Sequence, residues 1–167
     1  ITNAHVISGG KSCWVALDTG VTYDARLVGY DEDEDLAVLR AIADNPLPAA
    51  EFGNSDLLTV GDPVYAIGNP LGLGLAISSG IIGSTAHELD RYALPCIVNS
   101  ADISRGSSGG ALMNAHGQVI GVTSGAYTYG NNMYLAVPVD PVMAADLTVS
   151  GWTLKEVKAI EAVKDKD

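Results

Sequence analysis

The chain has 167 residues, of which 47% are hydrophobic, 17% are charged and 19 are glycines, and its formal net charge is −11 at pH 7. This length fits one compact globular unit, and the acidic balance argues against nucleic-acid binding because no basic stripe is present to neutralise phosphates. No apolar run reaches the ~18 residues that a membrane-spanning helix needs, so no membrane span is predicted.

Short β-branched and alternating segments, separated by turn residues, predict an all-β fold with nine strands. In chain order the predicted strands are residues 13–17, 23–30, 36–40, 64–67, 76–84, 94–99, 111–113, 119–124 and 133–137. Asp140-Pro141 then has the pattern of a helix N-terminus, and the apolar residues of 153–163 recur at helical spacing. We therefore expect one or two helices at the C-terminal end.

Three short strings carry the residues of nucleophilic catalysis: His5 in TNAHV, Asp35 before LAVL, and Ser108 in GSSGG. A serine hydroxyl becomes nucleophilic when a base such as imidazole takes its proton, and a buried carboxylate orients that base. The apolar strand after Asp35 would carry it inward, and Asp33 is the alternative. The other members of the run 31–35 are predicted to form a solvated turn.

The glycines around Ser108 predict a tight turn whose backbone N–H groups converge on one point. We assign an oxyanion hole to Gly106, Ser107 and Ser108, with the N–H groups of Gly106 and Ser108 as donors. GSSGG also fits the nucleophile elbow of α/β-hydrolases, but that motif needs a following helix and a later acid and histidine. The segment after Ser108 instead predicts strand, turn, strand, with His116 in the turn. His87 is predicted to lie in a surface loop.

The order His, Asp, Ser is that of chymotrypsin-type proteases, and the surrounding motifs resemble HtrA/Deg-type trypsin-like serine proteases. The motifs are ITNAHV, DEDEDLAVLR, FGNSDLLTVGDPVYAIGNPLG and ADISRGSSGGALMNAHGQVIGV. The resemblance implies a chymotrypsin-like double six-stranded β-barrel, with the first barrel incomplete because strands that usually precede the histidine are missing. The implied division is residues 1–50 for the first barrel, 51–62 for the connector, 63–139 for the second barrel and 140–167 for the helical end, with no PDZ domain.

The same resemblance implies a substrate of extended or unfolded polypeptide, which would pair with the backbone edge of Thr123, Ser124 and Gly125. Asp102, six residues before Ser108, would lie at the base of the primary specificity pocket. A free carboxylate there would favour Lys or Arg, whereas HtrA-type enzymes often accept small aliphatic residues, and Arg105 could neutralise Asp102. Both specificities stay open.

The family also implies an extracytoplasmic location, and the oligomeric state stays open. No cofactor and no metal site is predicted, because the three histidines and two cysteines are scattered. We expect Cys13 and Cys96 to be small buried hydrophobic residues rather than a disulfide. The alternative function is a non-catalytic peptide-binding module, or an inactive fragment, derived from a protease barrel.

Overall fold

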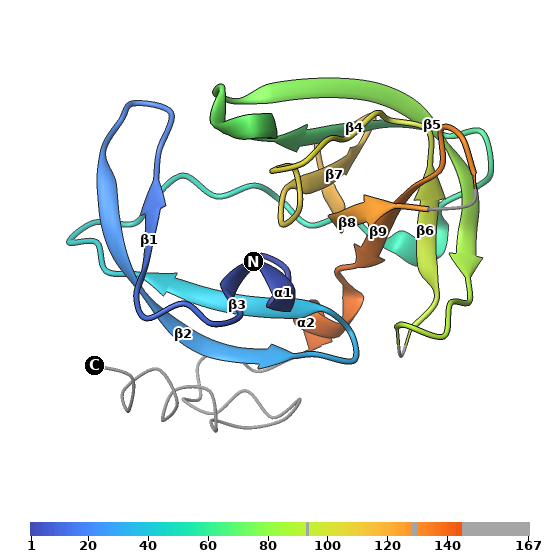
Figure 1. The fold of residues 1–167 in the computed structure, drawn as a ribbon. Coiled ribbons are helices and arrows are strands. Elements are labelled where there is room, and N and C mark those ends of the chain that lie inside the picture. Colours follow the sequence, from blue (N-terminus) through green and yellow to red (C-terminus); the bar gives the residue numbers. More distant parts are fainter. Residues whose placement is uncertain (93, 128–129, 145–167) are drawn as a thin grey trace.

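The fold is known from a computed structural model, which describes residues 1–92, 94–127 and 130–144. The described residues form nine strands, one at each predicted place, so the all-β prediction is confirmed. They are β1 (Cys13–Ala16), β2 (Thr22–Asp31), β3 (Leu36–Ala41), β4 (Pro63–Gly68), β5 (Ala76–His87), β6 (Cys96–Asn99), β7 (Ala111–Asn114), β8 (Val119–Ala126) and β9 (Tyr134–Pro138). Figure 1 shows them in two groups, β1–β3 and β4–β9, joined by a long connection.

Helices are few in the described part of the chain. The single-turn helix α1 (Ala4–Ile7) precedes β1, and α2 (Asp140–Ala144) follows β9. Two short 3₁₀ turns, η1 (Ser55–Leu57) and η2 (Pro70–Gly72), lie on either side of β4. The first predicted C-terminal helix is therefore present as α2, whereas the second, over 153–163, lies outside the described residues. Within the described ranges, no helix is long and apolar enough to cross a bilayer.

The first group is an antiparallel sheet in the order β1-β2-β3. Thr2 adds a short antiparallel bridge to Ala37 of β3, in which each residue's N–H bonds to the other's carbonyl at 2.8–2.9 Å. This bridge holds the start of the chain, and with it α1, against β3. Because α1 follows the bridge directly, its side chains come to lie at the end of β3 where Asp35 precedes the strand.

The second group is a closed antiparallel barrel in the order β4-β5-β6-β9-β8-β7. Alternate residues face its interior, as in β4, where Val64 and Ala66 are buried while Pro63 and Tyr65 are exposed. The inward-facing residues form one apolar cluster: Val64, Ala66, Ile82, Ile97, Ala101, Leu112, Ile120 and Ala136. Barrel closure pairs every strand on both sides, which gives a rigid frame for the loops that leave it.

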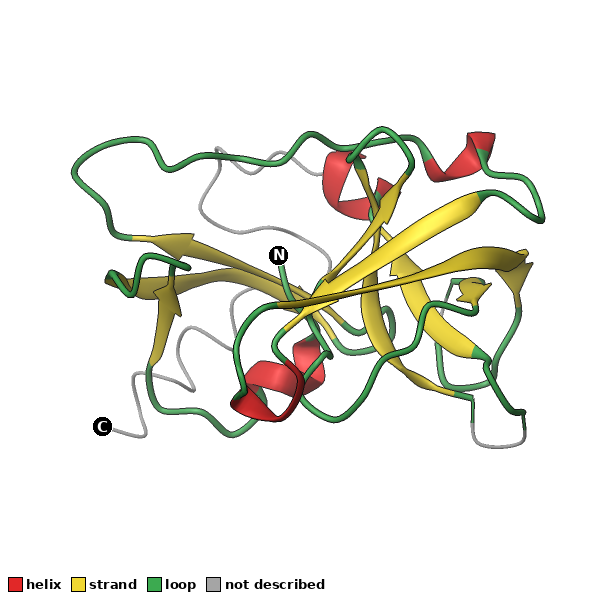
Figure 2. Cartoon of the chain, turned by 90° about the horizontal axis from the view of Figure 1, so that it is seen from above, coloured by secondary structure: helices red, strands yellow, loops and turns green. Residues whose placement is uncertain are grey.

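A second apolar cluster joins the sheet to the barrel. It contains Val28, Leu36, Val38, Tyr92, Cys96, Val98, Val122, Leu135, Val137, Val139 and Val142. The first three come from β2 and β3, and the remainder come from the barrel strands, the β5–β6 connection, the residue before α2 and α2 itself. Figure 2, viewed from above, shows the two sheets meeting near the centre of the molecule. Burial of this cluster fixes how the sheet and the barrel are placed relative to each other.

Two predictions for single residues need correction. Cys96 is buried as expected, but Cys13 is half-buried on β1, where its thiol donates to the carbonyl of Ala25 at 3.2 Å. Both thiols are free. His87 is not a loop residue, because β5 continues through it to pair with Cys96, and its ring packs edge-on against Tyr127 at 5.8 Å. The exposed His116 lies in the β7–β8 turn, as predicted.

Candidate active site

His5 and Asp35 meet in close contact. The Nδ1 atom of His5 lies 2.9 Å from both carboxylate oxygens of Asp35, and the backbone N–H of His5 donates to Oδ1 at 3.0 Å. Asp35 is buried, whereas the His5 side chain is 38% exposed. Because a carboxylate only accepts hydrogen bonds, Nδ1 carries a proton toward Asp35, and in the neutral imidazole the other ring nitrogen, Nε2, is an acceptor.

The acidic turn before β3 explains how Asp35 reaches this position. The buried side chain of Asp31 accepts from the N–H groups of Asp33 and Glu34 at 2.8 and 3.1 Å, which closes the turn. Asp35 then takes a left-handed conformation with φ of 53°. Its carbonyl accepts from Nδ2 of the buried Asn3 at 3.0 Å. The turn holds Asp35, rather than the exposed Asp33, against His5.

The prediction that the other four members of the acidic turn are solvated is therefore wrong for two of them. Asp31 is buried, and Glu34 is half-buried. Burial, together with the neighbouring charges of Asp31 and Asp33, raises the pKa of the Glu34 carboxyl above its ordinary value. The sequence offered no signal that Asp31 would close the turn rather than face solvent.

The far side of the Asp35 carboxylate is bound by the barrel. The hydroxyl of Ser124, on β8, donates to Oδ2 of Asp35 at 2.6 Å, and the Tyr92 hydroxyl lies 2.8 Å from the same Ser124 oxygen. Sequence reasoning selected Ser124 for its backbone and missed its side chain, and it missed Tyr92 altogether. Both contacts join segments that are far apart in the chain, and no local sequence pattern predicts such contacts.

The serine loop lies directly beside the histidine segment. Gly109 has a positive φ of 85°, and a Cβ added there would lie 2.2 Å from the Thr2 side-chain oxygen, so only glycine allows this approach. The hydroxyl of the half-buried Ser108 donates to the carbonyl of Ser124 at 2.9 Å. Ser124 thus contacts Asp35 through its side chain and Ser108 through its backbone. Within the described part of the chain, no hydrogen bond joins Ser108 to His5.

The backbone before Ser108 is fixed by a contact with η2. The carbonyl of Arg105 accepts from the N–H of Leu71 at 2.8 Å, and Leu71 itself has a positive φ of 58°. The carbonyl of one residue and the N–H of the next point in opposite directions across a trans peptide. The Gly106 N–H, in the same peptide as the Arg105 carbonyl, therefore points away from Leu71.

The predicted oxyanion hole needs one correction. The Ser107 N–H donates to the carbonyl of Ser104 at 2.9 Å, so it is not available to a ligand. Among the described residues, the N–H groups of Gly106 and Ser108 have no hydrogen-bond partner in the protein. These are the two donors that the sequence predicted, and the remaining role of Ser107 is to fold the loop.

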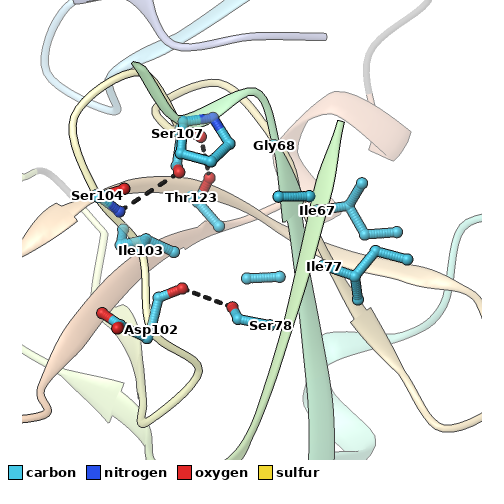
Figure 3. Close-up of a pocket in the computed structure, with 12 residues that line it drawn as sticks. Ile67, Gly68, Ile77, Ser78, Asp102, Ile103, Ser104, Ser107 and Thr123 are labelled. Atoms are coloured by element: carbon cyan, nitrogen blue, oxygen red, sulfur yellow. Dashed lines mark hydrogen bonds between the residues drawn. The ribbon is translucent and has the colours of Figure 1, made fainter. Parts of the chain in front are cut away.

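A small pocket of about 130 Å³ opens beside this loop (Figure 3). Its lining is mostly apolar or serine: Ala66, Ile67, Gly68, Pro70, Ala76, Ile77, Ser78, Asp102, Ile103, Ser104, Ser107 and Thr123. Figure 3 shows the Asp102 carbonyl turned toward Ser78, and this carbonyl accepts a hydrogen bond from the Ser78 hydroxyl at 2.5 Å. The Asp102 carboxylate points away from Ile77. That carboxylate accepts from the Tyr134 hydroxyl. Asp102 contributes its backbone to the pocket, and the described contacts include no ion pair between it and Arg105.

The predicted substrate edge is shorter than expected. The N–H of Thr123 donates to Gly110 at 2.9 Å, and its carbonyl accepts from Gly109 at 2.8 Å, so both of its backbone groups are used within the protein. A bulge in the pairing with β9 separates Thr123 from Gly125, and a Cβ added at Gly125 would meet nothing within 4 Å. Open space therefore adjoins Gly125. No group of three potential metal ligands gathers anywhere in the described part of the chain.

Comparison with known proteins places this geometry in a family. The profile of the trypsin-like peptidase domain matches residues 1–122. A probable periplasmic serine endoprotease, DegP-like, from Halomonas elongata is 41% identical over 147 residues, which cover 86% of this chain and 31% of that protein. A protein of Synechocystis named "Putative serine protease HhoA" is 36% identical over 156 residues, covering 90% of this chain and 40% of that protein.

Solved structures give the same result. The HtrA-type protease AlgW with a tripeptide superposes with a TM-score of 0.78 at 35% identity, covering 86% of this chain and 49% of that one. AlgW with a decapeptide gives 0.77 at 32% identity over 98% and 47%. The chain belongs to the trypsin-like peptidase family, as a protease domain of the HtrA type with the predicted chymotrypsin-like fold. It spans about a third of the length of the curated relatives that it matches.

Proposed function

We propose that this chain is a serine endopeptidase that hydrolyses peptide bonds in extended or unfolded polypeptides through an acyl-enzyme on Ser108. The observation that carries the proposal is the oriented His5–Asp35 pair, linked through Ser124 to the hydroxyl of Ser108. His5 is the base that takes the Ser108 proton and the acid that returns it to the leaving amine. Asp35 holds the imidazole and stabilises its protonated form.

Substrate binding prepares the nucleophile in this mechanism. The Ser124 carbonyl, which now accepts from Ser108, is the natural acceptor for a substrate backbone N–H at the edge of Ser124 and Gly125. When that N–H takes its place, the Ser108 hydroxyl rotates about its side-chain bond toward Nε2 of His5. His5 then removes the proton as Ser108 attacks the carbonyl carbon.

The negative charge that develops on the substrate oxygen is received by the N–H groups of Gly106 and Ser108. The Leu71–Arg105 hydrogen bond supports this assignment, because it holds the Gly106 peptide in one orientation before the reaction. Donors fixed in advance cost no reorganisation in the transition state. Loss of one such donor is typically worth about 100- to 1000-fold in rate.

Small aliphatic side chains are the substrate residues that we assign to the 130 Å³ pocket. Its walls include Ile67, Ile77 and Ile103, and the one carboxylate nearby points away and is bound to Tyr134. A Lys or Arg side chain would enter this pocket without a free anion to pair with, which costs desolvation energy. The basic specificity considered from the sequence is therefore not the one that we propose.

The cellular location of the enzyme and the kind of partner that it binds are proposed from its relatives. The Halomonas protein is named periplasmic, so an extracytoplasmic location is the one that we infer for this chain. Structures of the HtrA-type protease AlgW carry a tripeptide or a decapeptide, which supports a polypeptide as the partner.

The direct test is hydrolysis of a reduced and alkylated protein by the wild-type chain and by Ser108→Ala. We expect the variant to lose turnover by a factor of about 1000 or more while still binding the substrate. Ser79→Ala, at an exposed serine on β5, is the matched control and should keep full activity. Equal hydrolysis by the wild type and Ser108→Ala would contradict the proposal. Substrate binding with no turnover in the wild type would favour the alternative of a peptide-binding module.

A further inference from the structure

Tyr92 comes from the β5–β6 connection. Its hydroxyl lies 2.8 Å from Oγ of Ser124, and that oxygen donates to Oδ2 of Asp35 at 2.6 Å. Ser124 has one hydroxyl proton, and the carboxylate can only accept, so that proton lies on the Asp35 side. The Tyr92 hydroxyl must therefore be the donor to Ser124. The direction of every hydrogen bond from Tyr92 to Asp35 is thereby fixed.

All three members of this chain of hydrogen bonds are sheltered from water. Tyr92 is 9% exposed, Ser124 is 6% exposed and Asp35 is 5% exposed. Without Tyr92, the Ser124 hydroxyl would still donate to Asp35, but the acceptor side of its oxygen would lose its partner in a site sheltered from solvent. A buried polar chain that is fully satisfied is rigid, whereas one with a missing member loses that rigidity.

The Tyr92 ring is itself held in place. It belongs to the apolar cluster between sheet and barrel, its N–H donates to the carbonyl of Leu89 at 3.0 Å, and the Arg91 guanidinium lies over the ring at 5.5 Å. Burial raises the pKa of the Tyr92 hydroxyl above its ordinary value. The hydroxyl is therefore a neutral donor throughout the range in which a histidine base operates. The charged and titratable groups that act on it are Arg91, Asp35 and Cys96.

Asp35 is thus held from two directions. Asn3 and the His5 backbone bind it from the N-terminal segment, and the Ser124 hydroxyl binds it from the barrel. We propose that Tyr92 is a positioning residue for the reaction: by donating to Ser124, it commits the Ser124 hydroxyl to Asp35 and so fixes the plane of the carboxylate that orients His5. This inference rests on the proposed function of the His5, Asp35 and Ser108 set.

The test uses Tyr92→Phe, which keeps the ring in the apolar cluster and removes only the hydroxyl. We expect kcat and the rate of fluorophosphonate labelling of Ser108 to fall about three- to tenfold, the kinetic equivalent of one neutral hydrogen bond, with KM unchanged. Tyr23→Phe, at a half-buried tyrosine on β2, is the control and should leave both rates unchanged. An unchanged kcat in Tyr92→Phe would overturn the proposal.

The double variant separates positioning from packing. If Tyr92 acts through Ser124, its removal has no further effect once Ser124→Ala has removed the intermediate hydroxyl. A Tyr92→Phe effect of the same size in both backgrounds would show that the tyrosine acts only through packing, and would overturn the proposal.

An NMR measurement tests the positioning role of Tyr92 independently of enzymatic activity. The Nδ1 proton of His5 should give a downfield NMR signal whose exchange with water is at least about threefold faster in Tyr92→Phe than in the wild type. If wild-type Ser108 fails to label with the fluorophosphonate, the proposed function fails, and this signal still decides the role of Tyr92. Faster exchange would support positioning of Asp35, and unchanged exchange would overturn it.

Discussion

The Ser124 hydroxyl and the Asp35 carboxylate are 2.6 Å apart although the two residues are 89 positions apart in the chain. Asp35 lies in the β2–β3 turn of the three-stranded sheet and Ser124 lies on β8 of the barrel, so this hydrogen bond crosses the junction between the two. The apolar cluster that includes Leu36 and Val122 holds that junction together. The site is therefore built only when the sheet and the barrel dock.

Asp35→Asn is expected to reduce kcat about 10⁴-fold with little change in KM. An amide NH₂ in place of a carboxylate oxygen would favour the imidazole tautomer with its proton on the wrong nitrogen, as is found in trypsin-type enzymes. Asp33→Asn, in the exposed part of the same turn, should leave kcat within about twofold of the wild type. A large loss in Asp33→Asn, with none in Asp35→Asn, would reverse the assignment. The measurement is steady-state hydrolysis of one peptide substrate.

Asp102→Asn is expected to leave the choice of substrate unchanged. The Asp102 carboxylate points away from the pocket and accepts from Tyr134, so its charge does not face an entering side chain. The ratio of kcat/KM for peptides with Val and with Lys before the cleaved bond should stay within about threefold of the wild type. A strong preference for Lys in the wild type that Asp102→Asn abolishes would show that the carboxylate is the specificity determinant.

Gly80→Ala is expected to destabilise the fold by about 3 kcal/mol or more. The added Cβ would lie 2.2 Å from the backbone nitrogen of Ala101, and neither backbone can move without opening the barrel. Gly83→Ala, on the same strand, is the matched control: its Cβ would meet the Val98 carbonyl at an ordinary 3.6 Å. That variant should lie within about 1 kcal/mol of the wild type. Urea unfolding of both variants measures the difference, and equal stability would contradict the close crossing at Gly80.

Cys96 should make the fold sensitive to alkali. Burial raises the pKa of its thiol from 9.0 to about 11. Between those values the folded protein retains a proton that the unfolded chain releases, so stability is fully present below pH 9 and falls as the pH rises toward 11. The expected loss is about 2–3 kcal/mol, since one pKa unit corresponds to about 1.4 kcal/mol.

The control for this prediction is Cys96→Val, which keeps an apolar side chain at the site and removes the titrating group. Its free energy of unfolding, followed by urea titration at increasing pH, should fall less steeply than that of the wild type. Tyr92, whose pKa is also raised by burial, contributes a loss in the same direction to both proteins. Parallel curves for the two proteins would show that Cys96 does not titrate as a buried thiol.

Much of this architecture could be read from local sequence patterns. All nine strands were predicted because β-branched runs and glycine-rich turns are local signals. His5, Asp35 and Ser108 were selected because each lies in a short motif with its own chemical meaning. The apolar strand after Asp35 predicted that this carboxylate, rather than that of Asp33, is carried inward, and Asp35 is the buried one of the two.

The parts that sequence reasoning missed depend on contacts between distant segments. Nothing near Tyr92 indicates that its hydroxyl reaches Ser124, and nothing near Leu71 indicates that its N–H binds Arg105. The orientation of Asp102 was likewise undecided, because position in the chain places its backbone at the pocket but not its carboxylate. Such features follow from the docking of loops on a closed barrel, which no pattern in a single segment encodes.

The central claim is that His5 and Asp35 activate Ser108, and fluorophosphonate labelling of the purified chain tests it most directly. Intact mass and peptide mapping would locate the adduct, because the probe reacts with an activated serine and not with ordinary hydroxyls. The account predicts one adduct per chain, on Ser108, that is lost in His5→Ala. Absence of an adduct from the folded wild-type chain, or an adduct that His5→Ala leaves unchanged, would contradict it.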